Sequence, residues 1–219
     1  MSLTYPTLLF EQDLWKSGFR CIAGIDEAGR GAWAGPVCAA VVILPEDPAL
    51  TQTLCGVRDS KLMTPQARLN WAPRIREAAQ AYGVGFASSQ EIDSLGILPA
   101  TRLAATRALE TLLPDYLLTD YLIFPNIELP QTGLVKGDQL SLSVASASVL
   151  AKTARDMFMC AADDSYPGYG FARHKGYGTR LHQQAIRELG LCEIHRKSFS
   201  IMSDENTNPG SFTGQPKIA

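Results

Sequence analysis

Two apolar segments, separated by a loop rich in glycine, constrain the fold more than any other feature of this chain. Residues 21–26 (CIAGID) and 37–44 (VCAAVVIL) have the character of buried strands, and the loop at 29–35 reads GRGAWAG. A short connection of this kind predicts an antiparallel pair of strands. A dinucleotide-binding unit would continue from its glycine loop into a helix, whereas Pro36 and a strand follow here. The pair therefore favours a sheet that begins with antiparallel strands.

The rest of the chain alternates between helical and strand-like segments. Helices are predicted for the lead-in at 1–18, from an N-cap at Thr64 to about 82, at 98–113, from 143 to about 163 and at 179–189; further strands are predicted at 83–88, 116–120 and 134–136. Pro73 is expected to kink or split the second helix. This order predicts an α/β protein in which helices cover a mixed sheet. Residues 1–200 are expected to form one domain and the polar residues 201–219 a flexible tail.

The composition excludes several classes of protein. With 219 residues, 46% of them hydrophobic, and a formal net charge of −2, the chain is neither disordered nor a basic coat for nucleic acid. Its five cysteines include no CxxC pair, which argues against a zinc site and a disulfide framework. Residues 1–20 lack the pattern of a signal peptide, and no apolar run approaches the ~20 residues of a membrane span. A cytoplasmic protein without a membrane partner is expected.

Four carboxylates stand where predicted elements begin or end. Asp26 and Glu27 end the first strand, Asp120 ends another, and Asp138 precedes the long helix. Such positions can bring the side chains together at one edge of a sheet. Hard oxygen donors suit Mg²⁺ or Mn²⁺ rather than zinc, and a pair of these ions stabilises the attacking and leaving oxygens of a phosphodiester. Each acid taken singly is better explained as a solvated loop residue or a cap, and only their shared position beside strands and glycines favours a site.

The sequence leaves three interpretations of the glycine loop open. The N–H groups at 29–31 could bind a hydroxyl or a phosphate close to the metal ions. The loop could be a weak relative of the dinucleotide fingerprint, although two acids without a metal ion would then face a pyrophosphate. It could also be a tight turn that needs positive φ.

A second group of residues could contact a nucleic-acid backbone. Residues 166–199 hold six Lys and Arg against two Glu, interleaved with three His and three Tyr. This predicts a backbone-binding surface with stacking aromatics, or simply a solvated helix face. On the long helix, Ser148 and Lys152 have i, i+4 spacing and can point the same way. Ser148, like Ser146, could bind phosphate or permit close helix packing.

Taken in order, these segments resemble bacterial ribonuclease HII, of the type 2 ribonuclease H family. The matching motifs are GIDEAGRG at 24–31 with AGPV at 34–37, DSK at 59–61, Asp120, KGD at 136–138 with SVASASVLAKTARD at 143–156, and KGYGT at 175–179 leading to HRKSF at 195–199. They cover residues 20–200. Ala32-Trp33 stands where the family more often has a Pro-Leu type pair, and Ser146 where Ala is common. Neither departure removes a proposed ligand.

The resemblance implies a fold and an activity. The fold would be ribonuclease H-like, with a central mixed five-stranded sheet flanked by helices and a small helical C-terminal part. The activity would be that of an endoribonuclease that hydrolyses RNA in RNA/DNA hybrids. It would also nick 5′ of single ribonucleotides embedded in duplex DNA, leaving 3′-hydroxyl and 5′-phosphate ends. The enzyme would act as a monomer with Mg²⁺ or Mn²⁺, by a two-metal mechanism.

The resemblance also implies a role for each site residue. The catalytic metal ligands would be Asp26, Glu27, Asp120 and Asp138; Gly29, Arg30 and Gly31 would contact the 2′-hydroxyl; Tyr177 would stack on the deoxyribose after the ribonucleotide; and Lys61, Ser148 and Lys152 would contact phosphates. Reading a 2′-hydroxyl is how a protein distinguishes RNA from DNA.

Several rival functions stay open. Another two-metal nuclease or an integrase on the same fold would share the acids but lack the GRG loop and Tyr177. Ribonuclease HIII is disfavoured because it has an extra N-terminal domain, while only about 20 residues precede the first acid. A catalytically silent hybrid-binding module is disfavoured because four converging carboxylates repel a phosphate when no metal is bound. A nucleotide-cofactor enzyme is disfavoured by the strand after the loop.

Overall fold

The computed structural model describes residues 5–201, so the tail predicted at 201–219 lies outside the described residues from position 202 on. The strands are β1 (Ile22–Ala28), β2 (Val37–Ile43), β3 (Ala81–Ala87), β4 (Tyr116–Asp120) and β5 (Gln131–Leu134). The helices are α1 (Leu9–Lys16), α2 (Leu50–Thr53), the 3-10 turn η1 (Ser60–Leu62), α3 (Pro65–Ala78), α4 (Ser89–Leu95), α5 (Ile97–Leu109), α6 (Gly137–Leu140), α7 (Leu142–Ser165), α8 (Phe171–His174) and α9 (Arg180–Leu189). None of these helices is long and apolar enough to cross a membrane.

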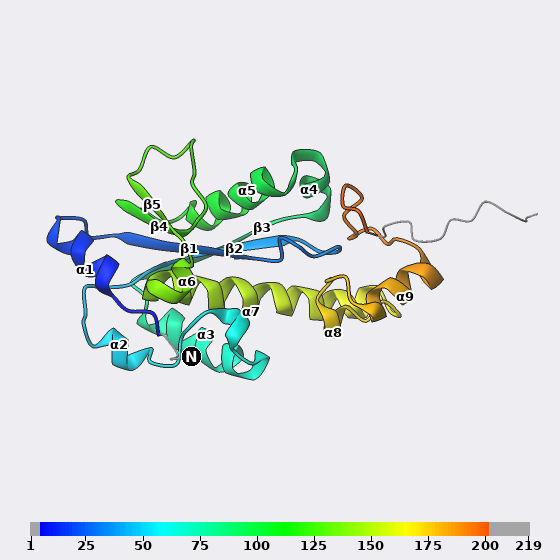
Figure 1. Cartoon of the computed structure of the whole chain (residues 1–219), viewed down its shortest axis with the longest axis horizontal. Coiled ribbons are helices and arrows are strands. Elements are labelled where there is room, and N and C mark those ends of the chain that lie inside the picture. The colour runs from blue at the N-terminus through cyan, green and yellow to red at the C-terminus, as the bar shows by residue number, and fades with distance from the viewer. Residues whose placement is uncertain (1–4, 202–219) are drawn as a thin grey trace, which may run out of the picture.

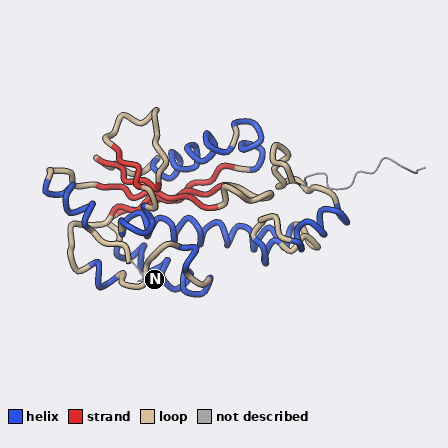
Figure 2. Tube along the Cα trace, in the orientation of Figure 1, coloured by secondary structure: helices blue, strands red, loops and turns tan. Residues whose placement is uncertain are grey.

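The five strands form one mixed sheet in the order β3-β2-β1-β4-β5. β1 pairs with β2 and β2 with β3 in antiparallel fashion, while β1–β4 and β4–β5 are parallel. The sheet lies between two layers of helices, with α4 and α5 on one face and α7 and α3 on the other (Figures 1 and 2). The predicted antiparallel pair and the ribonuclease H-like arrangement are both confirmed.

β2 shows why the sheet needs cover on both faces. All seven of its residues are buried, and because side chains alternate along a strand they divide between two cores. Cys38, Ala40 and Val42 belong to the core beneath α7 and α3, whereas Val37, Ala39, Val41 and Ile43 belong to the core beneath α5.

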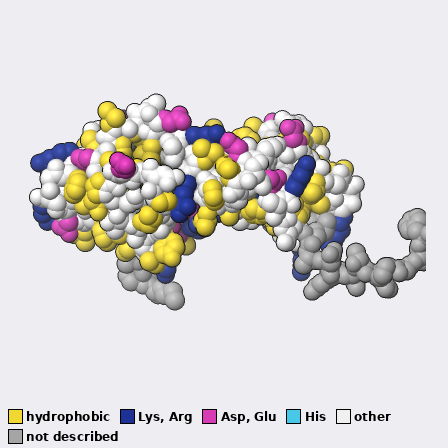
Figure 3. Space-filling view, turned by 90° about the horizontal axis from the view of Figure 1, so that it is seen from above, with side chains coloured by type: hydrophobic (Ala, Val, Ile, Leu, Met, Phe, Trp, Pro, Cys, Tyr) yellow, Lys and Arg dark blue, Asp and Glu magenta, His cyan; other side chains and the backbone are white. Residues whose placement is uncertain are grey.

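On the outer surface above α4 and α5, acidic and basic side chains are interspersed (Figure 3).

The long helix α7 lies unusually close to β1. A Cβ atom at Gly24 would come within 2.3 Å of the backbone of Ser143, so only glycine permits this approach. Small side chains on α7 assist, and the hydroxyl of Ser146 donates to the carbonyl of Leu142 at 2.7 Å. The predicted lead-in helix is α1, whose buried Glu11 accepts hydrogen bonds from the Ser143 N–H and hydroxyl at the start of α7. A carboxylate in this place suits the positive end of the helix dipole.

Several predicted details of the elements were wrong: β1 runs to Ala28 and not to Asp26, and α5 ends at Leu109 and not at 113. α3 ends at Ala78, not near 82, because Tyr82 belongs to β3. Pro73 does not split that helix, since it lies on the exposed side, where water can meet the carbonyl that loses its partner. The last strand occupies Gln131–Leu134 instead of 134–136, because Lys136 has a left-handed φ of 60° and turns the chain into α6.

The C-terminal part has a small core of its own, which takes up the three histidines and Arg196 of the segment 166–199, while Arg173, Arg180, Arg187 and Lys197 stay exposed. Met159, Tyr169 and Phe171 form its apolar centre, and His174, His182, His195 and Arg196 are buried with them or beside them. The ring nitrogens of two of these histidines form a chain of hydrogen bonds. The N–H of Cys192 donates to His195 Nδ1, so His195 carries its proton on Nε2 and donates it to His182 Nε2. His182 therefore carries its proton on Nδ1 and donates it to the carbonyl of Tyr177. These histidines hold the chain at 177 from inside.

Acid is expected to weaken this core through His182. Burial and the neighbouring His174 lower the pKa of His182 to about 4, whereas an unfolded histidine titrates near ~6.5. The unfolded state therefore binds the extra proton between these values, and stability present above pH 6.5 is lost as the pH falls toward 4. Between pH 7 and 4.5 the free energy of unfolding should fall by about 2 to 3 kcal/mol from this group.

Urea unfolding at both pH values measures this effect. His182→Gln, whose amide can accept from His195 and donate to the Tyr177 carbonyl without titrating, should lose less stability on acidification. Equal pH slopes in the two proteins would contradict the assignment.

Candidate active site

Three of the predicted carboxylates meet at one end of the sheet. Asp26 lies on β1, Asp120 ends the neighbouring parallel strand β4, and Asp138 lies in the first turn of α6. One carboxylate oxygen from each lies within 4.8 Å of the others. The local chain fixes this arrangement, since the N–H of Gly137 donates to Asp120 at 2.8 Å and so ties the start of α6 to the end of β4.

The cluster carries negative charge that the described protein residues do not fully compensate. Asp26 is 3% exposed, and its Oδ2 has no hydrogen-bond partner among the described residues. Burial, then the charges of Glu27 and Asp120, raise the pKa of Asp26 well above its usual value. Burial, then Asp59 and Asp120, raise the pKa of Asp138 to about 6. Within residues 5–201, only the exposed Lys61 forms an ion pair with Asp138, at 3.6 Å.

These observations fit a divalent cation. A buried carboxylate oxygen without a partner, beside two others at ligand spacing, is a set of hard donors that suits Mg²⁺ or Mn²⁺. Asp26, Asp120 and Asp138 could hold the ion directly. Glu27 lines the same cleft, where its carboxylate pairs with Arg30 at 3.0 Å. Burial raises the pKa of Glu27 in spite of that pair.

Cation binding at this cluster should depend on pH. Because burial and neighbouring carboxylates raise the pKa of Asp138 to about 6 and it must lose its proton to ligate, protonation of this group alone should lower the affinity for Mn²⁺ about fivefold between pH 6 and 5. Binding at pH 6 should release protons, which titration calorimetry in two buffers of different ionisation enthalpy would count. An affinity that is constant from pH 5 to 7 would contradict the cluster as the binding site.

The glycine loop forms another wall of the cleft. The cleft has a volume of about 630 Å³ and is lined by Asp26, Glu27, Ala28, Gly29, Arg30, Gly31, Ser60, Lys61, Arg68, Asp120, Lys152 and Tyr177. The loop continues from β1, so Asp26 and the N–H groups at 29–31 belong to one short segment. Gly29 has a φ of +92°, which explains one of the two glycines of the GRG sequence by backbone conformation.

Tyr177 and Lys152 line the same cleft as the loop. The Lys152 ammonium lies 5.3 Å from the centre of the Tyr177 ring, and its Nζ donates to Asp156 at 2.8 Å. The structure therefore brings Lys61, Lys152 and Tyr177 to the cleft. Ser148 lies behind the wall, where its buried hydroxyl donates to Ser60 Oγ at 2.8 Å. Its phosphate contact stays a prediction.

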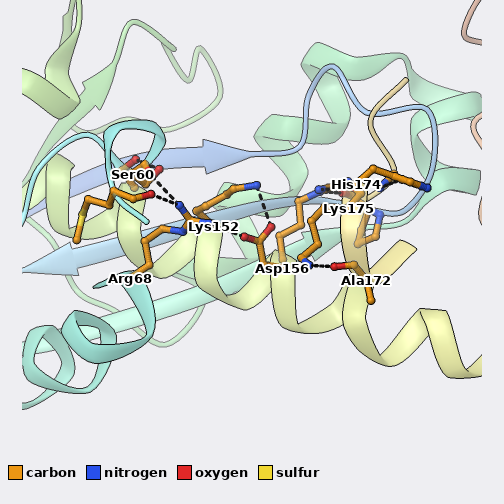
Figure 4. A network of polar contacts seen from close by, with 12 residues as sticks. Ser60, Arg68, Lys152, Asp156, Ala172, His174 and Lys175 are labelled. Atoms are coloured by element: carbon orange, nitrogen blue, oxygen red, sulfur yellow. Dashed lines mark hydrogen bonds and ion pairs between the residues drawn. The ribbon is translucent and has the colours of Figure 1, made fainter. Parts of the chain in front are cut away.

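Sequence analysis missed a charged network beneath this wall. The buried Arg68 donates to the carbonyls of Ser60 and Met63 and to Asp156, at 2.9, 2.7 and 2.9 Å (Figure 4). Asp156 thus links the loop before α3 to Lys152 on α7. Asp59 was also missed as a site residue, although it is buried and its charge acts on Asp138. The DSK sequence at 59–61 was the available signal for it.

Comparison with known proteins gives a consistent result. A family model described as ribonuclease HII matches residues 23–202. A ribonuclease HII from Synechococcus sp. (strain JA-3-3Ab) is 49% identical over 203 residues, which cover 91% of this chain and 90% of that protein. A ribonuclease HII from Dehalococcoides mccartyi is 51% identical over 193 residues, covering 87% of this chain and 90% of that protein.

Solved structures show the same fold at lower sequence identity. The crystal structure of ribonuclease H2 from Pyrococcus horikoshii has a TM-score of 0.69 and 23% identity, covering 82% of this chain and 94% of that one. Ribonuclease HII from Archaeoglobus fulgidus, in a complex with PCNA, has a TM-score of 0.71 and 23% identity, covering 86% and 98%. Bst-RNase HIII in complex with Mn²⁺ has a TM-score of 0.63 and 19% identity, covering 90% and 71%.

Proposed function

The chain belongs to the ribonuclease HII family, and from this premise we propose that it both hydrolyses RNA in RNA/DNA hybrids and nicks duplex DNA 5′ of a single embedded ribonucleotide. Its class, an endoribonuclease of the ribonuclease H type that depends on divalent cations, follows from the family. The nick at single ribonucleotides, the 3′-hydroxyl and 5′-phosphate ends, and the role of each residue belong to the proposal.

One observation carries the proposal: the acidic cluster and the glycine loop share a single cleft, which Tyr177 also lines. In this proposal Asp26, Glu27, Asp120 and Asp138 hold the metal ions. Bound divalent ions supply Lewis acidity for in-line displacement at a phosphodiester. Mg²⁺ and Mn²⁺ both suit the oxygen donors, and we propose that either supports the reaction.

The other cleft residues select and place the substrate. The N–H groups at 29–31 would meet the 2′-hydroxyl, and Tyr177 would stack on the sugar that follows the ribonucleotide. Lys61 and Lys152 present ammonium groups beside the carboxylates and would contact flanking phosphates, with Ser148 as a further contact reached through movement of the Ser60 loop. Contacts of this kind go to the phosphates of the nucleic-acid backbone, so they place the substrate without a preference for any base.

Two further parts of the proposal concern the setting of the enzyme. We propose that it acts as a monomer, which light scattering of the purified protein would test. We propose a cytoplasmic location, which suits five cysteines that are all free thiols. Cell fractionation with an antibody against the chain would test it.

The decisive experiment uses two 5′-labelled duplexes of the same sequence, one all-DNA and one with a single ribonucleotide. Each is incubated with the protein in Mg²⁺, in Mn²⁺ and in EDTA. A nick 5′ of the ribonucleotide, absent in EDTA and absent on all-DNA, is expected, and a DNA polymerase should extend the product from its 3′-hydroxyl. Binding without cleavage would favour a silent hybrid-binding module. Cleavage of both duplexes would leave the metal site intact and overturn the account of 2′-hydroxyl recognition.

A further inference from the structure

Arg196 holds the glycine loop from inside the protein. Its Nη2 donates to the carbonyl of Gly29 at 2.7 Å, its Nη1 to that of Arg30 at 2.8 Å and its Nε to that of Gly35 at 3.0 Å. The side chain is 0% exposed. All three nitrogens of the guanidinium group are therefore used on one loop that begins 167 residues earlier in the chain.

These bonds fix the directions of the loop's N–H groups. A trans peptide is planar, so the N–H of each residue points away from the carbonyl of the residue before it. Because Arg196 turns the carbonyls of Gly29 and Arg30 inward, the N–H groups of Arg30 and Gly31 point outward, on the side of the cleft. Neither N–H has a hydrogen-bond partner within residues 5–201. A Cβ placed at Gly31 would have no atom within 4 Å, so this side of the loop is open.

Arg196 also leaves its positive charge beneath the loop. No carboxylate of the described residues lies within 4 Å of its guanidinium group. The guanidinium charge instead interacts with the dipoles of the peptide groups whose carbonyls it binds, and the N–H ends of the peptides after Gly29 and Arg30 face the cleft. The arrangement favours an electronegative oxygen at those N–H groups.

The segment around Arg196 is itself anchored to the loop and to α4. The N–H of Arg196 donates to the carbonyl of Trp33, and the N–H of Gly35 donates to that of Ile194, both at 2.8 Å. On the next turn, Asp93 accepts from the N–H groups of Lys197 and Ser198 at 3.0 and 2.9 Å. Arg196 therefore reaches the loop from a fixed backbone.

We propose that Arg196 is the positioning residue for substrate selection, because it aims the Arg30 and Gly31 N–H groups at the 2′-hydroxyl or adjoining phosphate of the substrate. This inference rests on the proposed function and deepens it. Arg196 does not touch the substrate and acts through the loop. Loss of its bonds should free the loop to turn its peptides while the acidic cluster, which is held by β1, β4 and α6, stays in place.

The test compares Arg196→Lys with the unaltered enzyme. Lysine keeps the charge, but its single ammonium cannot bridge the three carbonyls as the guanidinium group does. Three quantities are measured: KM and kcat on an RNA/DNA hybrid, the Ki of an all-DNA competitor duplex of the same sequence, and the Kd of Mn²⁺. We expect KM to rise at least about tenfold, kcat to fall less than KM rises, and the ratio of Ki to KM to move toward one. The Kd of Mn²⁺ should be unchanged.

A matched control separates selection from stability. Ile75→Ala removes a fully buried side chain of α3 that does not line the cleft, and it should destabilise the fold by about 2 to 5 kcal/mol. Measured well below the melting temperatures of this variant and of the unaltered enzyme, Ile75→Ala should have the same ratio of Ki to KM as the unaltered enzyme. If Arg196→Lys does not fold, Asp93→Ala carries the test. It releases the N–H groups of Lys197 and Ser198, and it should raise KM about threefold.

The outcomes distinguish this inference from the proposed function. An unaltered enzyme that shows no preference for hybrid over DNA overturns the proposed function, and this inference with it. If the unaltered enzyme prefers the hybrid, but Arg196→Lys leaves both KM and the ratio of Ki to KM unchanged, only the inference about Arg196 is overturned. Unchanged KM in Asp93→Ala, where that variant is the one measured, does the same.

Discussion

Replacing Asp138 with Asn is expected to reduce cleavage of an RNA/DNA hybrid by at least about a thousandfold while hybrid binding stays measurable. The amide has no negative charge and one oxygen instead of two, so the cluster of Asp26, Asp120 and Asp138 loses a ligand. Single-turnover cleavage and equilibrium binding of the hybrid in EDTA measure the two effects separately. Normal cleavage by the variant would remove Asp138 from the metal site.

The same substitution should stabilise the metal-free protein. Burial and the carboxylates of Asp59 and Asp120 raise the pKa of Asp138 from 3.8 to about 6. The folded state therefore holds a proton more tightly than the unfolded chain does, and stability from this group falls as the pH rises from about 4 to 6. At pH 7 in EDTA, Asp138→Asn should raise the free energy of unfolding by about 1 to 3 kcal/mol.

Glu128→Gln is the matched control, because it makes the same change of charge at an exposed position outside the cleft. It should change neither cleavage nor stability measurably. A loss of stability in Asp138→Asn would contradict the electrostatic account of the cluster, even if cleavage were abolished.

Gly29→Ala is expected to have the largest effect on the fold of the cleft. Gly29 has a φ of +92°, and an added Cβ would lie 1.9 Å from Nε of the buried Arg155. Arg155 cannot move aside easily, since it donates to the carbonyls of Ala34, Pro36 and Lys175. Backbone strain and overpacking together should reduce the free energy of unfolding by about 2 to 6 kcal/mol.

Cleavage of the hybrid by Gly29→Ala should fall at least about a hundredfold, because the loop must shift to relieve the clash. Two other glycines separate the causes. Gly18 has a φ of +100° and no atom near an added Cβ, so the loss of stability in Gly18→Ala reports backbone strain alone. Gly31 has open space around an added Cβ and no positive φ, so Gly31→Ala should leave stability nearly unchanged. Thermal unfolding of the three variants gives the comparison. Equal losses for Gly18→Ala and Gly29→Ala would show that Arg155 adds nothing.

The sequence predicted those parts of the fold that depend on local pattern. β1 and β2 are largely apolar runs separated by a loop that begins with Gly29 and ends with Pro36, and α7 is a long run rich in small and apolar residues. The acidic cluster was predictable because Asp26 directly follows the apolar residues 22–25 near the end of β1, and Asp120 ends the apolar strand β4. β5 was misplaced because it is a partly exposed edge strand with the polar sequence QTGL. α4 was missed although Ser88 and Glu91 form a capping box, which is a readable signal.

The support of the cleft could not be predicted in this way. Arg155 and Arg196 read as basic residues, and only the folded chain shows that both are buried against backbone carbonyls far away in sequence. Carbonyl acceptors leave no trace in the side-chain pattern, because every residue has one. For the same reason His174, His182 and His195 suggested a surface that binds nucleic acid, whereas they are packed inside the C-terminal core.

The contact between Arg196 and the loop at 29–31 also sets an order of events during synthesis. A ribosome releases β1, with Asp26 and the loop, long before it reaches residue 196, and Asp120 and Asp138 emerge in between. A nascent or truncated chain that ends after α9 therefore holds every carboxylate of the cluster but lacks the side chain that shapes the loop. On the proposed role of Arg196, the growing chain therefore acquires substrate selection later than it acquires the acidic cluster. On the same proposal, proteolytic cleavage directly after α9 would remove Arg196 while Asp26, Asp120 and Asp138 stay in the chain.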